Sequence, residues 1–329
     1  MNIDIFPHIL PKPYFEKIQS TGPQGMLMAK RIVNVKPLHD IDTRLRIMDE
    51  YDNYQQVLTL GAPAIEAIAG PDVTPGLAQL ANDEMAKLCK ERPDNFLGFV
   101  CSLPMNNPDA AIKELERSID QLGATGVQLY TNANGKPLDL PEFEPLFAKM
   151  AEAKLPIWLH PTRTPAVAEY IDEPRSYYDM WWAFGWPFET SVAMGRIVFS
   201  GLFDHYPDLS IITHHMGAMI PYFAGRVGPG LEALGERSDD PIDAAALSNL
   251  KKNPGEYFRM FYGDTALFGA VPAMRCGLDY FGADHVLFGT DMPFIGQISD
   301  TLDGLAKLDL TPADRHAIME GNARRLLAI

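Results

Sequence analysis

Short runs of apolar and β-branched residues recur along the chain, and most are followed by a stretch in which apolar positions repeat with helical spacing. Such runs, bounded by Gly, Pro, Asn or Asp, are typical of strands. The expected strands cover residues 2–6, 55–59, 96–100, 126–129, 156–160, 210–214, 259–263 and 286–290. Because the runs are continuously apolar rather than alternating, they predict parallel strands covered by helices.

Amphipathic stretches that predict helices lie between these runs, and several open with proline in the first turn, where its missing N–H is tolerated. The expected helices include residues 75–91, 108–122, 141–153, 188–205, 267–280 and 312–327. Regular alternation of eight strands with helices predicts an α/β fold of the (β/α)8 barrel type. A doubly wound open sheet is the alternative, but no glycine-rich phosphate turn follows the first strand.

Two connecting segments are longer than a minimal barrel requires. They cover residues 12–39, after strand one, and residues 161–186, after strand five. Long loops at the carboxyl ends of barrel strands commonly cover the substrate. The second is rich in aromatic residues, and we assign its Trp186 to substrate binding. A subunit interface is the alternative role of this aromatic segment. No repeat or Gly/Ser-rich linker divides the chain, so we expect a single domain over residues 1–329.

Composition narrows the classes of function. The 329 residues include 28 Lys and Arg against 43 Asp and Glu, a net charge of −15, which disfavours nucleic acid and anionic membranes as partners. With only 3 cysteines, neither a disulfide framework nor a thiolate metal site is expected. The sequence has no basic leader pattern and no apolar run long enough for a bilayer. We therefore expect a cytoplasmic protein.

Candidate chemistry lies where strands end, because the carboxyl ends of barrel strands meet at one mouth. His8 follows strand one, His160 ends strand five, His214 and His215 end strand six, and Asp291 follows strand eight. Imidazoles and a carboxylate at one mouth suit a divalent metal ion, with Zn favoured and Mn the alternative. For each histidine a structural role is the alternative, and Asp291 could instead cap a helix.

The chain resembles the amidohydrolase superfamily, and within it the branch of aminocarboxymuconate-semialdehyde, γ-resorcylate, 5-carboxyvanillate and 2,3-dihydroxybenzoate decarboxylases. The similarity runs nearly end to end and is carried by the order and spacing of its motifs. These are residues 3–11, 44–49, 114–117, 126–129, 160–161, 187–191, 215–217, 225–226 and 288–294. The resemblance implies one divalent metal ion held by His8, His160 and Asp291.

The same resemblance assigns further residues. It makes His215 the acid/base beside the metal, with Asp291 also in a catalytic role. It implies that Arg44 or Arg46 contacts a substrate anion, and that Arg226 reaches the site of a neighbouring subunit in a homodimer or larger homo-oligomer. An arginine fork matches a carboxylate, so a small acid can bind an acidic protein. The alternative for Arg44 and Arg46 is a surface pair on the first helix.

The sequence departs from the family pattern at two positions. Phe6 stands where the family has a ligand, so three protein ligands would remain and the metal could be weak or absent. Ala218 replaces a glutamate common in the benzoate-type decarboxylases. Successive strand residues face opposite sides, so we expect His215 in the mouth and His214 toward the helices or orienting its neighbour. The alternative is that His214 binds the metal in place of position 6.

These observations favour a metal-dependent decarboxylase of a small aromatic or unsaturated carboxylic acid, which fits the catabolism of aromatic compounds. A hydrolase or hydratase acting on a lactone or ring-cleavage product, with weak metal dependence or none, is the alternative. A non-catalytic binding or scaffold protein that lost its site through the change at position 6 is the third reading.

Overall fold

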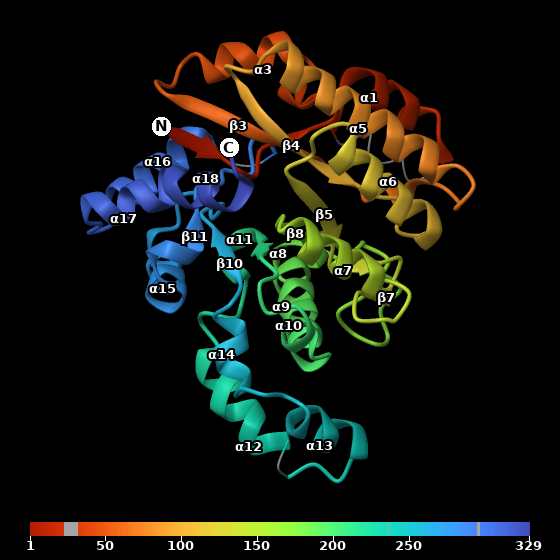
Figure 1. The fold of residues 1–329 in the computed structure, drawn as a ribbon, viewed down its shortest axis with the longest axis vertical. Helices are drawn as coiled ribbons and strands as arrows, with labels where there is room; N and C mark the ends of the chain where they lie inside the picture. Colours follow the sequence, from red (N-terminus) through yellow and green to blue (C-terminus); the bar gives the residue numbers. More distant parts are fainter. Residues whose placement is uncertain (23–31, 236, 295–296) are drawn as a thin grey trace.

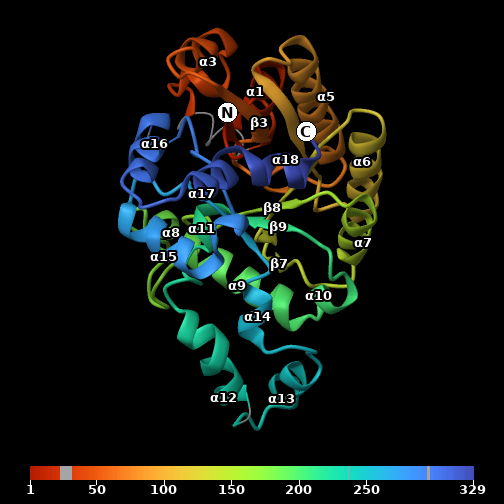
Figure 2. The ribbon, with the colours of Figure 1, turned by 60° about the vertical axis from the view of Figure 1, so that its left-hand side comes forward.

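Eight parallel strands form the centre of the molecule. The computed structural model describes residues 1–22, 32–235, 237–294 and 297–329. In spatial order the strands are β1 (Asn2–Asp4), β3 (Tyr54–Leu60), β4 (Phe96–Ser102), β5 (Gly126–Tyr130), β8 (Ile157–His160), β9 (Ile211–Thr213), β10 (Tyr262–Asp264) and β11 (Val286–Leu287). Spatial order follows chain order, so the predicted (β/α)8 barrel is confirmed (Figures 1 and 2).

The first and last strands approach each other and nearly close the barrel. The amide of Ile5 donates to the carbonyl oxygen of Phe288 at 3.0 Å, and that of Asp291 donates to Phe6 at 3.1 Å. A short continuation of the first strand, β2 (His8–Ile9), pairs in parallel with the end of β3. These contacts bring the chain around His8 next to the chain around Asp291.

Two apolar layers follow from the period of two along each strand. Val57, Val100, Trp158 and Ile212 belong to the cluster that fills the barrel, together with Ile3. Their neighbours in sequence, such as Leu58, Phe99, Leu159 and Ile211, belong to the larger cluster between barrel and helices. Strands buried on both faces explain why the sequence shows continuous apolar runs.

Helices follow the strands along the chain, and where the sequence predicts a helix, one lies close to the expected position (Figure 1). They are α1 (Lys12–Gln19), α3 (Ile41–Met48), α4 (Ile65–Ile68), α5 (Thr74–Glu91), α6 (Pro108–Asp120), α7 (Glu144–Ala153), α8 (Met180–Ala183), α9 (Gly185–Phe199), α10 (Leu202–His205), α11 (His214–Gly217), α12 (Leu231–Gly235), α13 (Pro241–Ser248), α14 (Pro254–Phe258), α15 (Val271–Phe281), α16 (Ile298–Ala306), α17 (Pro312–His316) and α18 (Asn322–Leu327). Short helical turns are η1 (Lys36–Leu38), η2 (Arg226–Gly230), η3 (Ala283–His285) and η4 (Ala317–Gly321), and a hairpin joins β6 (Asn132–Ala133) to β7 (Lys136–Pro137).

The predicted boundaries differ from the structure in three places. Gly201 has φ +76 and separates α9 from α10 within the single helix expected over 188–205. The seventh strand begins at Tyr262, because α14 occupies the chain up to Phe258. A third long excursion, besides 12–39 and 161–186, follows β9 and carries α12 and α13 away from the barrel (Figures 1 and 2).

Part of the excursion at 12–39, namely residues 23–31, lies outside the described residues. Over the described part of the chain, none of the helices is at once long and apolar enough to cross a membrane. That residues 1–329 act as a single domain stays a prediction.

Candidate metal and catalytic site

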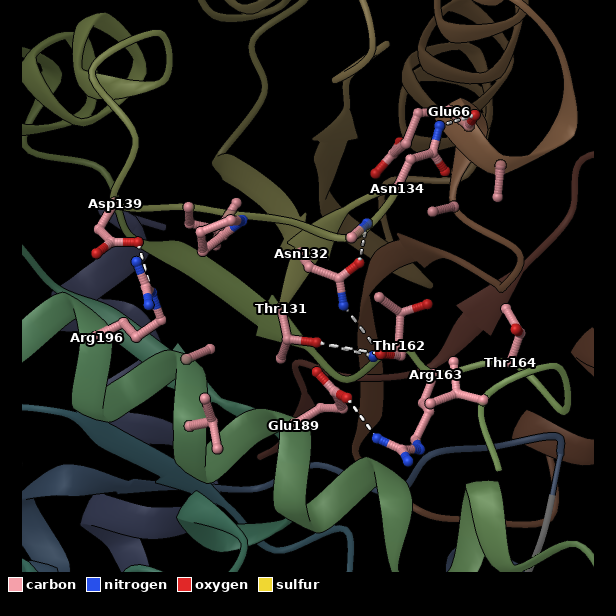
Figure 3. A pocket seen from close by; sticks show the side chains of 18 of the residues that line it. Glu66, Thr131, Asn132, Asn134, Asp139, Thr162, Arg163, Thr164, Glu189 and Arg196 are labelled. Carbon is pink, nitrogen blue, oxygen red and sulfur yellow. Dashed lines mark hydrogen bonds and ion pairs between the residues drawn. The ribbon is translucent and has the colours of Figure 1, made fainter. Parts of the chain in front are cut away.

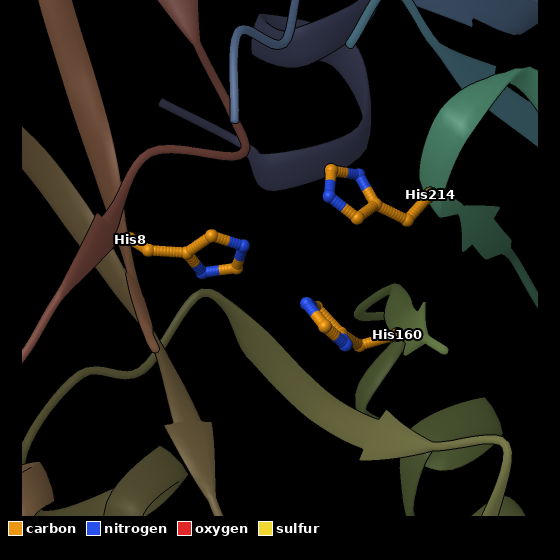
Figure 4. A group of neighbouring side chains, drawn as sticks. All are labelled: His8, His160 and His214. Carbon is orange, nitrogen blue, oxygen red and sulfur yellow. The ribbon is translucent and has the colours of Figure 1, made fainter. Parts of the chain in front are cut away.

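Three histidines meet at the carboxyl end of the barrel (Figure 4), and an aspartate lies beside two of them. His8 lies in β2, His160 ends β8, His214 directly follows β9, and Asp291 follows β11. All four are buried, with exposed fractions of 0%, 2%, 0% and 7% respectively. The strand-end criterion therefore located a real cluster of ionisable side chains.

The geometry of this cluster suits one ion. His8, His160 and His214 each offer a ring nitrogen, and these atoms lie within 4.8 Å of one another. Oδ1 of Asp291 lies 3.2 Å from Nε2 of His8 and 3.5 Å from Nε2 of His214. Nitrogen and oxygen donors converging on one point are the usual ligands of Zn, Mn, Fe and Co.

Hydrogen bonds at Nδ1 orient all three imidazole rings. Nδ1 of His8 lies 3.0 Å from the Thr59 hydroxyl, and Nδ1 of His160 lies 2.7 Å from the Pro161 carbonyl. Nδ1 of His214 lies 2.5 Å from Oδ2 of Asp264. A partner at Nδ1 fixes the ring and leaves Nε2 to bind a metal.

The buried Nε2 atoms test whether the residues fit a metal. Nε2 of His8 and Nε2 of His214 are buried and make no hydrogen bond of good geometry to a described residue; both face the same oxygen, Oδ1 of Asp291, at 3.2 and 3.5 Å. One oxygen shared at these distances satisfies two buried nitrogens poorly, and an unsatisfied buried polar atom costs about 1–3 kcal/mol. A metal ion would satisfy both nitrogens, and the donor set therefore fits one.

Burial sets the protonation of the ligand candidates. It lowers the pKa of His8, and lowers that of His160 further with help from His8 and His214, which favours the neutral rings that bind metals. Burial alone would raise the pKa of Asp291, but the adjacent His214 and His8 lower it below its usual range. The result is an ionised Asp291 beside neutral rings of His8 and His160.

The two adjacent histidines of strand six have opposite shifts. Burial disfavours the charged form of His214, but Asp264 and Asp291 on either side raise its pKa to about 9. Burial and the neighbouring His214 lower the pKa of His215 to about 4. Nδ1 of His215 lies 2.6 Å from the carbonyl oxygen of Ala266, and its backbone amide donates to Asp264.

The expected orientation of His214 toward the helices is wrong. Its ring lies in the mouth, fully buried, and stacks on the ring of His215 with centroids 3.7 Å apart. Strand geometry ends at Thr213, and the left-handed backbone at His215 (φ 57) and Met216 (φ 56) removes the alternation on which the expectation rested. Both rings consequently reach the same site.

Phe6 occupies the mouth as an aromatic wall. Its ring stacks on that of His214 with centroids 3.8 Å apart and planes 16° apart. Four more aromatic rings surround the histidines: Trp186 and Tyr130 against His160, Phe294 against His8, and Phe268 against His215. The structure thus brings Trp186 to the site, where its centroid lies 5.5 Å from that of His160.

The three candidate arginines lie in different surroundings. Arg44 is fully buried, and its guanidinium donates to Gln56 and, at 2.8 Å, to the carbonyl oxygen of His8, so the surface-pair reading is wrong for it. Arg46 is exposed and donates to Thr43 on the same helix. Arg226 is exposed at the start of η2. Arg44 thus contacts the cluster through the backbone of His8, whereas Arg46 and Arg226 lie at the surface.

Sequence reasoning missed Asp264, which holds the His214 ring. The signal was present, because Asp264 directly follows the predicted seventh strand and satisfies the same strand-end criterion as His160. The Asp291 alternative, a helix cap, is wrong, because the next helix, α16, begins at Ile298 and is capped by Gln297.

A separate cavity of about 590 Å³ lies between the β6–β7 hairpin and α9 (Figure 3). Thr162 and Arg163, which follow His160 in sequence, form part of its wall, and Arg163 pairs with Glu189 at 2.9 Å. None of the three clustered histidines lines this cavity. Its wall nevertheless includes Thr131 and Thr162, which follow the carboxyl ends of β5 and β8, so it adjoins the histidine cluster without including it.

Comparisons with known proteins agree with this geometry. The family model described as Amidohydrolase matches residues 8–329. The chain belongs to the amidohydrolase family. Within this family, a γ-resorcylate decarboxylase from Rhizobium sp. (strain MTP-10005) is 33% identical over 299 residues, covering 88% of this chain and 87% of that protein.

Two further relatives broaden the family comparison. The 2-amino-3-carboxymuconate-6-semialdehyde decarboxylase of Dictyostelium discoideum is 29% identical and covers 100% of this chain and 92% of its own. The crystal structure of a dihydroxybenzoic acid decarboxylase from Polaromonas sp. JS666, with bound manganese and the inhibitor 2-nitroresorcinol, matches with a TM-score of 0.80 and 28% identity. That match covers 99% of this chain and 96% of the other.

Proposed function

We propose that this amidohydrolase is a metal-dependent decarboxylase of a small aromatic or unsaturated carboxylic acid. The observation that carries the proposal is the convergence of His8, His160, His214 and Asp291 at the strand ends, in a fold shared with decarboxylases. The relatives named above act on resorcylate, dihydroxybenzoic acid and a carboxymuconate semialdehyde, which are all small unsaturated acids. The substrate of this chain belongs to that class.

His8, His160 and Asp291 are the proposed metal ligands, in line with the resemblance. A divalent ion bound there supplies Lewis acidity toward the oxygens of the acid. Manganese in the Polaromonas structure supports a divalent ion. Zinc, expected from the sequence, stays a prediction.

The chain's own residues orient the substrate and move the proton. Trp186 and Phe268 flank His160 and His215 and form apolar walls that would hold a planar acid. His215 is the acid/base, because its Nδ1 is held by Ala266 and its ring stands beside the donor cluster. Because its pKa is lowered to about 4, the ring is neutral at pH 7; it would take up a proton from water and pass it to the reacting carbon as the bond from that carbon to the departing CO2 breaks.

Substrate acids are the direct test. The metal-loaded protein should release CO2 from at least one of 2,6-dihydroxybenzoate, 5-carboxyvanillate and 2-amino-3-carboxymuconate 6-semialdehyde, with one decarboxylated product formed per CO2. His160→Ala and Asp291→Ala should abolish the release. No CO2 from any of these acids, together with hydrolysis of lactones by the same preparation, would support the hydrolase or hydratase. A scaffold role predicts that both variants leave function unchanged.

A homodimer is proposed as the working unit. The exposed position of Arg226 in η2 leaves its side chain free to reach a second subunit, and Tyr170 and Tyr178 in the aromatic segment are 73% and 90% exposed. If Arg226 holds the substrate carboxylate of the partner's site, specific activity falls on dilution below the dimer dissociation constant. Unchanged specific activity in the monomer would remove this role. A cytoplasmic location is likewise proposed from the sequence alone.

A further inference from the structure

Position 6 leaves the first strand with a single donor. The resemblance expects two ligands there, but the phenyl ring of Phe6 cannot bind a metal, so strand one contributes only His8. With His160 and Asp291 that makes three protein ligands, so a fourth protein ligand would have to come from another strand. Of the side chains described around the mouth, His214 is placed to provide it.

His214 has the surroundings of a metal ligand. Its ring nitrogen lies within 4.8 Å of the ligand atoms of His8 and His160, and its Nε2 is 3.5 Å from Oδ1 of Asp291. This Nε2 is fully buried and makes no hydrogen bond of good geometry to any described residue. The opposite nitrogen, Nδ1, is held by the carboxylate of Asp264 at 2.5 Å, the arrangement commonly found behind metal-bound histidines.

Two rings hold the imidazole of His214 between them. Phe6 stacks on it at 3.8 Å and 16°, and His215 stacks on it at 3.7 Å and 25°. These contacts restrict ring rotation, while Asp264 restricts the position of Nδ1. A ligand whose orientation is fixed before the metal arrives loses little conformational freedom on binding.

Resting on the metal dependence of the proposed function, we infer that His214 is a metal ligand in place of position 6, with Phe6 converted from a ligand position into a support for its ring. The donor set is then three imidazole nitrogens and the carboxylate of Asp291. Imidazole-rich sets favour Zn, Co and Fe, whereas oxygen-rich sets favour Mn and Mg. The inference therefore includes a shift in metal preference toward Zn and Co.

Metal binding itself is the readout. Apo-protein would be titrated with Co²⁺ and Zn²⁺ in competition with a fluorescent chelator, which gives the metal Kd. Elemental analysis counts the bound metal, and visible absorption of the Co²⁺ form reports the number of donor atoms. His214→Ala should weaken binding of both ions by about 100-fold or more and change the Co²⁺ spectrum. The exposed His316→Ala, which also removes one imidazole, should bind Co²⁺ within about threefold of wild type.

A rescue variant separates loss of a ligand from loss of folding. Phe6→His in the His214→Ala background returns a donor to strand one. The double variant should bind Co²⁺ at least about tenfold more tightly than His214→Ala alone. His214→Gln, which keeps most of the side-chain volume, should lose affinity like His214→Ala, and thermal unfolding checks that each variant is folded.

Wild-type Co²⁺ affinity in folded His214→Ala or His214→Gln would overturn the inference. If these variants keep the metal but lose CO2 release, His214 is a proton carrier, and the decarboxylase function still stands. If the wild type binds Co²⁺ through His214 but decarboxylates no acid, the proposed function fails and the ligand assignment stands.

Discussion

Nδ1 of His214 lies 2.5 Å from Oδ2 of Asp264, and both side chains are completely buried. The other oxygen of Asp264 accepts hydrogen bonds from the backbone amides of His215 and Ala266, at 3.0 and 2.9 Å. One carboxylate therefore fixes both the ring of His214 and the backbone that leaves β9. The position of the strand-six histidines depends on the end of the seventh strand.

Replacing Asp264 should loosen the metal site without emptying it. In Asp264→Asn, one amide oxygen can still accept the backbone amides, but the NH2 group faces Nδ1 of His214 and cannot accept its proton. We expect metal affinity to fall about 10- to 100-fold, as for other residues that orient ligands. Chelator competition measures this, with Asp284→Asn, whose side chain is 76% exposed, as the control. Unaltered affinity in a folded Asp264→Asn would show that this contact does not orient the ligand.

Removing the imidazole of His215 should affect catalysis and spare the metal. A general acid or base typically contributes 10²- to 10⁴-fold to the rate, so we expect His215→Gln to lower kcat by roughly that factor. Metal content should match the wild type, and the metal Kd should change far less than in His214→Ala. The measurement is steady-state CO2 release alongside metal titration, with His205→Gln as the control. Equal kcat in the two variants would exclude His215 as the acid/base.

The carboxyl group of Glu66 should make stability depend on pH. It is 3% exposed, its Oε1 has no hydrogen-bond partner in the described part of the chain, and burial raises its pKa from 4.5 to about 8. Between these two values the folded state binds more protons than the unfolded state, so the free energy of unfolding falls as pH rises from about 4.5 to 8.

Glu66→Gln removes this titration and keeps the shape of the side chain. The difference in free energy of unfolding, variant minus wild type, should be roughly 2–3 kcal/mol larger at pH 8 than at pH 5.5. Urea unfolding at the two pH values measures the gain, and the exposed Glu116→Gln is the control. A variant that gains no stability relative to wild type over this interval would show that Glu66 ionises in the folded protein as it does in water.

Arg44 should matter for stability rather than for substrate charge. Its guanidinium donates to Gln56, His8 and Pro37, and lysine cannot reproduce that fork. Arg44→Lys should lower the free energy of unfolding by about 1–3 kcal/mol, whereas Arg46→Lys on the surface should change it by less than about 0.5 kcal/mol. A raised KM with unchanged stability in Arg44→Lys would instead favour the substrate contact that the resemblance implies.

Most of the architecture could be predicted from local pattern. All eight strands lie within a few residues of their expected positions, because a strand buried on both faces must be apolar throughout and a helix on a barrel must be apolar on one face. The excursion with α12 and α13 was missed, since its short helices lie away from the barrel and carry no comparable pattern.

The site divides in the same way. His8, His160 and Asp291 could be found from sequence because parallel strands in a barrel bring their carboxyl ends to one mouth. The role of Asp264 could have been suspected by the same rule, but its partner could not, since His214 and Asp264 come from different strands. For Arg44 the resemblance implies a substrate contact, and only the tertiary structure shows that its guanidinium is buried against the backbone of β2.

The sequence by itself determined the barrel, the family and the residues that stand at the mouth, since these follow from apolar periodicity and from the order of short motifs. Tertiary structure alone decided that both histidines of strand six, and not only His215, reach the mouth. Side-chain direction depends on backbone dihedrals, and the left-handed turn at His215 and Met216, beside the carboxylate of Asp264, places both rings together under Phe6.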